Sequence, residues 1–151
     1  MMSRAFVKET ASDAPPPERM VDDGPNLVTE AGMGLIVGHV VRLEAALKSE
    51  SNVLLRETLE RDLRYWQVKK ASALVTAPRA DGTVAFGSSV VLSRNGREQR
   101  LRIVGADEAD PAQGLISIRA PLAQAVIGAR AGDVIEADAP LGEINIISVG
   151  V

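Results

Sequence analysis

The sequence predicts an α+β protein in which an antiparallel helical hairpin, a short coiled coil, precedes a small antiparallel β-sheet domain with one short helix. Apolar residues recur at spacings of three and four from residue 33 to 47 and again from 55 to 73, which is the pattern of a coiled-coil seam. After Pro78 the pattern changes to short runs rich in Val and Ile between turn residues, as in strands.

Residues 1–26 are predicted to form a disordered, proline-rich tail. The run Ala14-Pro15-Pro16-Pro17-Glu18 excludes a helix and disfavours a central strand. Asp22-Asp23-Gly24-Pro25 has the composition of a turn. The alternative is a tail that becomes ordered on a partner, with Phe6 and Val7 as its apolar contact.

Residues 27–76 are predicted to form the short coiled-coil hairpin. The first helix should begin near Thr29, which is a suitable N-cap residue. The second should run from Val53 to Val75, because the polar stretch Lys48–Asn52 interrupts the apolar pattern. The competing interpretation is one continuous helix of about 45 residues, which needs a partner helix and therefore a dimer.

Residues 80–151 are predicted to form the sheet domain. The pair Asn95-Gly96 is typical of a tight turn between two antiparallel strands. A short helix is expected at 122–127, closed by Gly128. Strands are expected at residues 83–86, 89–92, 99–104, 115–118, 133–137 and 143–149.

Composition narrows the possible functions. Hydrophobic residues make up 46% of the chain but aromatic residues only 3%, so the core must be mainly aliphatic. The net charge of −3 is unlike that of proteins that bind nucleic acid directly, so DNA or RNA is expected near the protein rather than as its ligand.

The same composition excludes several kinds of site. The absence of cysteine rules out disulfides and thiolate metal sites, and a single histidine, His39, rules out a site with two imidazoles. No apolar run approaches the ~20 residues of a membrane span, and no signal sequence is evident. We therefore expect a cytoplasmic protein that does not bind membranes.

Three ordered motifs in the second half resemble the Gre family of bacterial transcript-cleavage factors, GreA and GreB. They are the stretch from Arg102 to Asp110 with its Asp-Glu-Ala-Asp string, the stretch from Ile116 to Gly128, and Ala131-Gly132-Asp133-Val134 followed by Leu141-Gly142-Glu143. The resemblance continues more weakly upstream, at residues 25–32 and 59–66, which match the two bases of the family's coiled coil.

The resemblance implies an FKBP-like C-terminal domain that docks on bacterial RNA polymerase at the rim of its secondary channel. The docking loop matches Arg119, Ala120 and Pro121, and we add Asp107 and Glu108 as candidate polymerase-binding residues. Asp107, Glu108 and Asp110 also invite a metal-site interpretation, but Pro111 and Gly114 favour a structural loop. Trp66 and Leu63 are expected in a core between the coil and the C-terminal domain.

The acidic motif that the family carries at the tip of its coil is missing. Between residues 37 and 56 the acidic side chains are Glu44 and Glu50, and Glu50 is a weak candidate for a tip contact. The arm is also short, because roughly 20 residues of helix span about 30 Å. The expected function is therefore a regulator of transcription elongation that is not itself an enzyme, has no catalytic residue, metal or cofactor, and does not stimulate cleavage.

Two other functions stay open. One is an active cleavage factor with a degenerate tip. The other is an FKBP-like binding or scaffold module unrelated to polymerase, although Phe86 is the only aromatic residue after position 66, where an isomerase pocket needs several. The protein is expected to be a monomer or a weak dimer.

Overall fold

The computed structural model describes residues 14–151, which fall into two compact units. One unit contains residues 14–24 and 36–72, and the other contains residues 25–35 and 73–151. Of the predicted tail, residues 1–13, including Phe6 and Val7, lie outside the described residues. Among residues 14–151, no helix has both the length and the apolar character needed to cross a bilayer.

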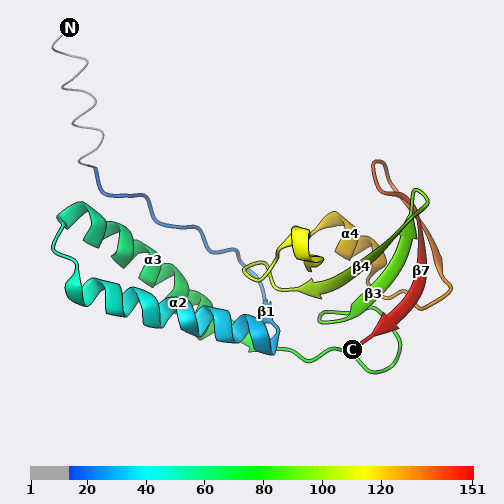
Figure 1. Ribbon diagram of the computed structural model, residues 1–151, viewed down its shortest axis with the longest axis horizontal. Helices are drawn as coiled ribbons and strands as arrows, with labels where there is room; N and C mark the ends of the chain where they lie inside the picture. The colour runs from blue at the N-terminus through cyan, green and yellow to red at the C-terminus, as the bar shows by residue number, and fades with distance from the viewer. Residues whose placement is uncertain (1–13) are drawn as a thin grey trace, which may run out of the picture. The chain divides into compact units, whose positions relative to one another are not determined.

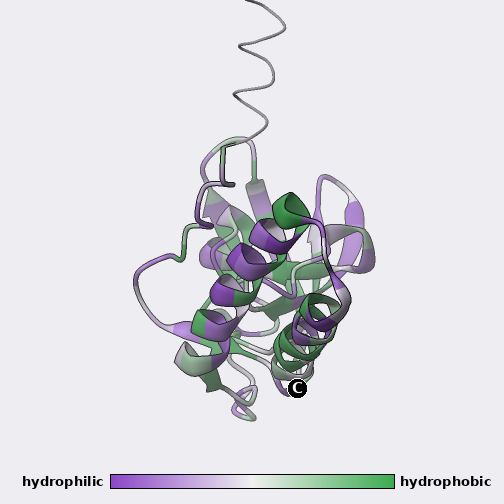
Figure 2. Ribbon diagram, turned by 90° about the vertical axis from the view of Figure 1, so that its left-hand side faces the viewer, coloured by the Kyte–Doolittle hydropathy of each residue, from purple (hydrophilic) through white to green (hydrophobic). Residues whose placement is uncertain are grey.

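The first unit is built on two antiparallel helices, α2 (Glu30–Ser49) and α3 (Val53–Ser72) (Figure 1). The first residues of α2, up to Leu35, belong to the second unit. Hydrophobic and hydrophilic residues alternate along the helices (Figure 2), and Ile36, Val40 and Trp66 are buried. The predicted helical hairpin is confirmed, and the alternative of one continuous helix is wrong.

Side chains at the turn between the helices end α2 and start α3. The Asn52 side-chain oxygen accepts a hydrogen bond from the Leu55 N–H (3.1 Å), which caps α3. The Arg56 guanidinium donates to the carbonyls of Leu47 (2.7 Å) and Glu50 (2.8 Å). These carbonyls have no partner inside α2, and a cation is favourable at a helix C-terminus. The polar link predicted between the helices is therefore an ordered turn.

The second unit contains a five-stranded sheet with the strand order β5-β4-β3-β7-β6. Its strands are β3 (Ser89–Arg94), β4 (Arg97–Val104), β5 (Leu115–Ser117), β6 (Val134–Ala137) and β7 (Gly142–Gly150). Neighbouring strands are antiparallel except β4 and β5, which are parallel, so the sheet is mixed rather than wholly antiparallel. The chain reaches β5 from β4 through the loop at 105–110 and a short 3-10 helix, Pro111–Gln113.

Helix α4 (Pro121–Val126) follows β5, close to the helix predicted at 122–127. The predicted turn is also confirmed, because Asn95 (φ 53°) and Gly96 (φ 73°) both adopt the left-handed conformation that such a turn requires. The predicted strand at 83–86 is wrong. Thr83 makes one isolated bridge with Arg130, and Val84 bonds to the loop at Gly128 and Ala129 instead of to a strand.

A second, two-stranded parallel sheet joins β1 (Asn26–Val28) to β2 (Ala73–Val75). The sequence places Asn26 in the tail and residues 73–75 in the second helix, which in fact ends at Ser72. Strands of three residues show no clear alternation, and the two partners lie far apart in the chain. Nothing local therefore predicts their pairing.

The core of the second unit lies on the inner face of the five-stranded sheet, against α4. It is aliphatic apart from Phe86, as the composition predicts. Its buried members are Val84, Phe86, Val90, Leu92, Ile103, Ala123, Val126, Ala129, Ile144 and Ile146.

Candidate functional site

The loop after β4 is tied to the first turn of α2, within the second unit. The Thr29 hydroxyl donates a hydrogen bond to the Glu108 carboxylate (2.5 Å) and accepts one from the Gly32 N–H (2.9 Å). Thr29 is therefore the N-cap of α2, as predicted. A carboxylate near a helix N-terminus is also favourable, because the helix dipole is positive there.

Two glycines allow this close approach. A Cβ at Gly32 would lie 2.8 Å from a Glu108 carboxylate oxygen. A Cβ at Gly105 would lie 2.6 Å from the carbonyl oxygen of Leu27 in β1. The loop thus packs against both β1 and the start of α2, which supports its interpretation as a structural loop.

The acidic residues of this loop do not converge on one point. Glu108 is engaged by Thr29, and the backbone of Asp110 pairs with Leu115. Among residues 14–151, no group of three His, Cys, Asp or Glu side chains is placed to hold a metal ion. Glu108 therefore has a clear structural role, while Asp107 stays a candidate for contact with a partner.

Residues 119–121, the predicted docking loop, lead from β5 to Pro121, the first residue of α4. The Ser117 side chain accepts a hydrogen bond from the Arg119 N–H (3.1 Å), and the Ser117 carbonyl accepts one from the Ala120 N–H (2.9 Å). The Gln124 amide donates to the Ile118 carbonyl (2.6 Å). The loop presents Arg119 and Pro121 on the surface, while Ala120 is half-buried.

A groove lies beside Pro121, between α4, β6 and the turn that leads into β7. Its apolar lining is flanked by two acidic side chains, Glu136 and Asp138. The residues that line it are Pro121, Gln124, Ala125, Ile135, Glu136, Ala137, Asp138, Ala139, Pro140 and Leu141. The sequence did not reveal this groove, because two separate segments, 121–125 and 135–141, form it.

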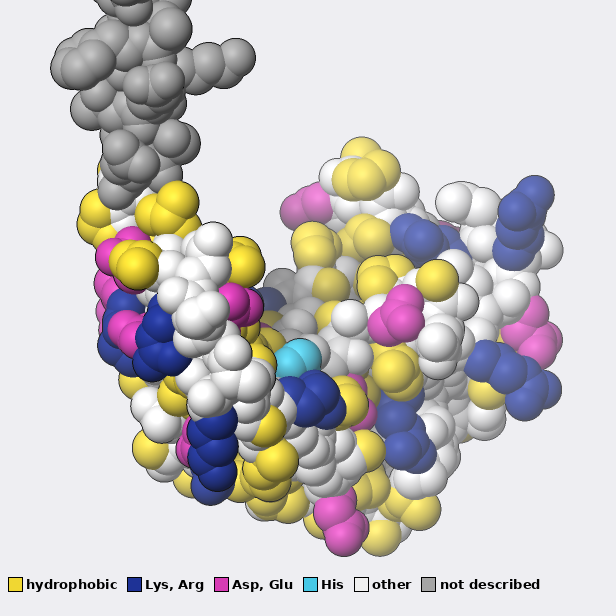
Figure 3. Space-filling model, turned by 60° about the vertical axis from the view of Figure 1, so that its left-hand side comes forward, with side chains coloured by type: hydrophobic (Ala, Val, Ile, Leu, Met, Phe, Trp, Pro, Cys, Tyr) yellow, Lys and Arg dark blue, Asp and Glu magenta, His cyan; other side chains and the backbone are white. Residues whose placement is uncertain are grey.

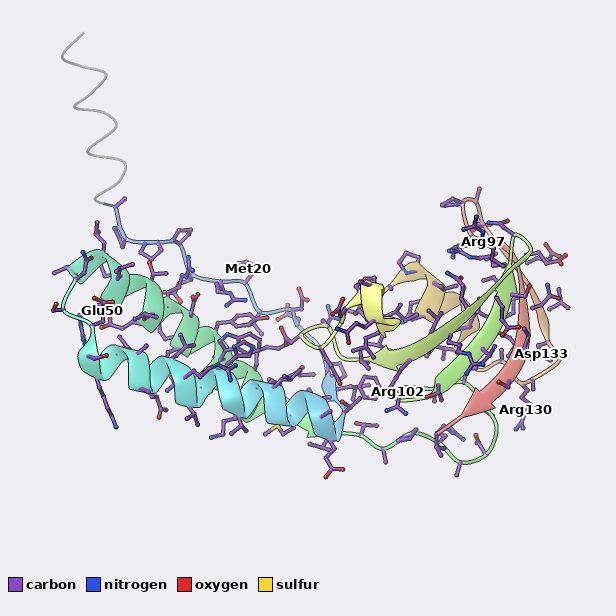
Figure 4. All side chains as sticks on the ribbon, viewed as in Figure 1. Met20, Glu50, Arg97, Arg102, Arg130 and Asp133 are labelled. Atoms are coloured by element: carbon purple, nitrogen blue, oxygen red, sulfur yellow. The ribbon has the colours of Figure 1, made fainter. Side chains whose placement is uncertain are left out.

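Glu50 lies at the turn between α2 and α3 (Figure 4). Its carboxylate accepts a hydrogen bond from the Asn52 N–H (3.1 Å). Glu44, the other acid between residues 37 and 56, is exposed within α2. Glu50 therefore helps to form the turn, and no second carboxylate from this stretch joins it there.

Trp66 lies in an aromatic cluster within the first unit. The residue is 8% exposed, and its ring stacks on His39, with ring centroids 4.0 Å apart and planes 9° apart. Tyr65 meets Trp66 edge-on at 5.0 Å, and Leu63 is half-buried. The stack gives His39 a packing role that its sequence neighbours do not suggest, because its partner is on the other helix. That Trp66 and Leu63 also form a core between the coil and the C-terminal domain stays a prediction.

Surface charges of both signs are interspersed on the face shown in Figure 3. In the second unit, the Arg79 guanidinium, with a further hydrogen bond from the Thr83 N–H, lowers the pKa of Asp81 to about 2. Nearby, the Arg130 side chain donates to the Asp81 carbonyl (2.9 Å), and Asp133 accepts a bond from the Arg130 N–H (2.9 Å) (Figure 4). These contacts hold the loops beside the sheet.

Residues 79–150 match the family model described as transcription elongation factor, GreA/GreB, C-terminal. Residues 79–150 are therefore a Gre-type C-terminal domain. The expectation drawn from the three sequence motifs is thus confirmed, since the match contains all of them.

Known Gre proteins align with part of the chain. It is 42% identical over 97 residues to transcription elongation factor GreB of Neisseria meningitidis, a match that covers 60% of each protein. It is 46% identical over 69 residues to transcription elongation factor GreA of Alkalilimnicola ehrlichii, covering 44% of each. The chain therefore spans less than two thirds of the length of these relatives.

Two solved Gre-family structures align with more of the chain. GreA factor homolog 1 (Gfh1) of Thermus thermophilus is 19% identical, with 85% of this chain and 100% of that chain covered and a TM-score of 0.41. The GreA/GreB factor from Nitrosomonas europaea is 24% identical, with 85% and 100% covered and the same TM-score, 0.41.

The bond between Thr29 and Glu108 predicts a measurable coupling. Thr29→Ala removes the cap of α2 and should lower the free energy of unfolding by about 1 kcal/mol. Glu108→Ala removes the same hydrogen bond by removing its acceptor. The double variant should therefore lose less free energy of unfolding than the sum of the losses in the two single variants. Urea denaturation measures the free energy of unfolding of all three variants. Thr58→Ala, a change within α3, is the control, and strictly additive losses would contradict the coupling.

Proposed function

We propose that this chain binds bacterial RNA polymerase through its Gre-type domain, at the rim of the secondary channel, and regulates elongation without stimulating transcript cleavage. The main observation that supports this proposal is the combination of a Gre-type domain at residues 79–150 with a hairpin turn that has one carboxylate, Glu50. Action on polymerase also implies a cytoplasmic protein and an accessory regulator rather than an enzyme.

The loop at 119–121 and the groove beside it are the best candidates for the docking surface. Arg119 and Pro121 are exposed on a loop that several hydrogen bonds support, so little conformational freedom is lost on binding. The apolar lining, flanked by Glu136 and Asp138, suits a partner helix with apolar and basic side chains. Asp107 can extend this surface, whereas Glu108 is committed to Thr29.

The hairpin turn lacks the chemistry that cleavage requires. A catalytic Mg²⁺ needs several oxygen ligands in a tight octahedral arrangement, and a second metal ion must be held beside the first. Glu50 is one carboxylate and already accepts a hydrogen bond from Asn52. The 20 residues of α2 correspond to a helix of about 30 Å, shorter than the arm that the family resemblance implies.

Competition for polymerase tests the docking proposal. This chain and the full-length Gre factor of the same host should exclude one another from core RNA polymerase, measured with one of them labelled. Ala125→Arg places a positive charge in the groove and should weaken binding by at least about tenfold, because like charges brought together at an interface cost several kcal/mol and the proposed partner is basic. Ala131→Arg, at an exposed turn, is the matched control. Simultaneous binding would mean that this chain uses a different site on polymerase, and no binding would favour a binding or scaffold module unrelated to polymerase.

A cleavage assay on stalled elongation complexes separates the two polymerase-dependent functions. With this chain at saturating concentration, the RNA should shorten no faster than with polymerase alone. A host Gre factor is the positive control. Rapid shortening that depends on Glu50, and is lost in Glu50→Gln, would replace the proposal with that of an active cleavage factor.

A further inference from the structure

Residues 15–22 form an extended segment, here called the strap, that runs beside α3 within the first unit (Figure 1). The strap contains no helix or strand. The sequence predicts a flexible tail here, and the side chains of the strap show instead a defined set of contacts with the hairpin.

A pair of opposite charges on the strap meets a pair of opposite charges on α3. The Glu18 carboxylate accepts hydrogen bonds from the Arg64 guanidinium, with distances of 3.1 and 3.2 Å from Nε to its two oxygens. Its neighbour Arg19 pairs with Asp62 at 3.5 Å. The contact with Arg64 lowers the pKa of Glu18 and raises that of Arg64. Each charge of the strap therefore faces an opposite charge on α3, where Asp62 also pairs with Arg61 at 2.8 Å.

Arg19 also lies against the aromatic cluster. Its guanidinium carbon is 3.8 Å from the centre of the Tyr65 ring and 5.6 Å from that of Trp66. Such stacking of a planar cation on an aromatic face is attractive. One residue of the strap thus combines an ion pair with a cation–π contact, which makes Arg19 its central anchor.

The sequence of the strap suits binding in an extended form. Pro15, Pro16 and Pro17 restrict the backbone before binding, so less freedom is lost when Glu18 and Arg19 dock. Met20, which follows Arg19, is 89% exposed and points away from the hairpin (Figure 4). Recognition of proline-rich segments by aromatic side chains is a recurring mode of peptide binding.

We propose that the α3 surface made by Asp62, Arg64, Tyr65 and Trp66 is a binding site for an extended segment with adjacent acidic and basic side chains, and that the strap is its reversible occupant. Exchange is expected because the pair of Glu18 with Arg64 is largely exposed, and exposed pairs are weak and screened by salt. A tethered strap nevertheless competes well, because its effective concentration is about millimolar. Any macromolecule that contacts this flank of the hairpin must first displace it.

The experiment uses the single tryptophan of the full-length chain. Trp66 is the only source of an indole N–H signal in a ¹H–¹⁵N spectrum. Glu18→Arg and Arg64→Glu each place like charges together and should shift this signal and increase quenching of Trp66 fluorescence by acrylamide. The double variant Glu18→Arg/Arg64→Glu restores opposite charges and should return both readouts towards the parent values. Raising salt to about 1 M, where the Debye length is ~3 Å, should move the parent towards the single variants.

Two outcomes would overturn the proposal. One is an indole signal that neither single variant moves, and the other is a double variant that resembles the singles. Glu18 lies outside both helices, so Glu18→Arg leaves the hairpin and the sheet domain folded, as the remaining amide signals will show. The measurement is made on the free chain and is therefore independent of whether the chain binds polymerase.

Discussion

Replacing Ile144 with Ala is expected to lower the free energy of unfolding of the sheet domain by about 2–5 kcal/mol. Ile144 is fully buried in β7, opposite Ile135 of β6, in the cluster between the sheet and α4. Loss of its methyl and methylene groups removes apolar burial and leaves a cavity that the surrounding strands cannot fill, because β7 is hydrogen-bonded on both sides. Urea denaturation followed by circular dichroism provides the measurement.

Ile147→Ala is the matched control for this effect. Ile147 lies on the same strand but is 46% exposed, so the same chemical change should cost less than about 1 kcal/mol. A similar loss for both variants would mean that β7 does not separate a buried from an exposed face as described. A large loss of free energy of unfolding at Ile144 alone would mean that the aliphatic core supplies most of the stability of the domain.

The second large effect is expected at Gly105. Gly105→Ala should destabilise the protein by roughly 1–3 kcal/mol, the usual cost of forcing extra volume into a packed site. The added Cβ would lie 2.6 Å from the Leu27 carbonyl oxygen, and a backbone atom cannot rotate away as a side chain can. Either β1 or the loop before Glu108 must move, which should also speed hydrogen exchange at the amides of Asn26–Val28.

Gly34→Ala tests whether the loss at Gly105 is steric. Gly34 lies in α2, and a Cβ there would have no neighbour within 4 Å. Alanine is the better helix former by about 1 kcal/mol, so this variant should gain stability. The two glycine-to-alanine changes should therefore have opposite signs. A loss at both positions would contradict the open surroundings of Gly34.

The sequence predicted the features that depend on neighbouring residues. The Thr29 cap, the polar break between the helices and the Asn95-Gly96 turn each result from short-range bonding and backbone preference, and the structure has all three. The aliphatic core follows from composition. The Gre-type motifs around Asp107 and Pro121 also lie within continuous stretches of chain, which is why residues 79–150 could be recognised before the fold was known.

Tertiary structure decided the features whose partners are distant in the chain. The pairing of β1 with β2, the bond between Glu108 and Thr29, and the contacts of Arg19 with Tyr65 and Asp62 join segments that share no local signal. The strand predicted at 83–86 failed for the same reason, because a strand needs a partner and residues 128–130 supplied only isolated bonds. Local preference selects helices and turns, whereas burial and the packing of distant segments determine which of the remaining polar groups bond to one another.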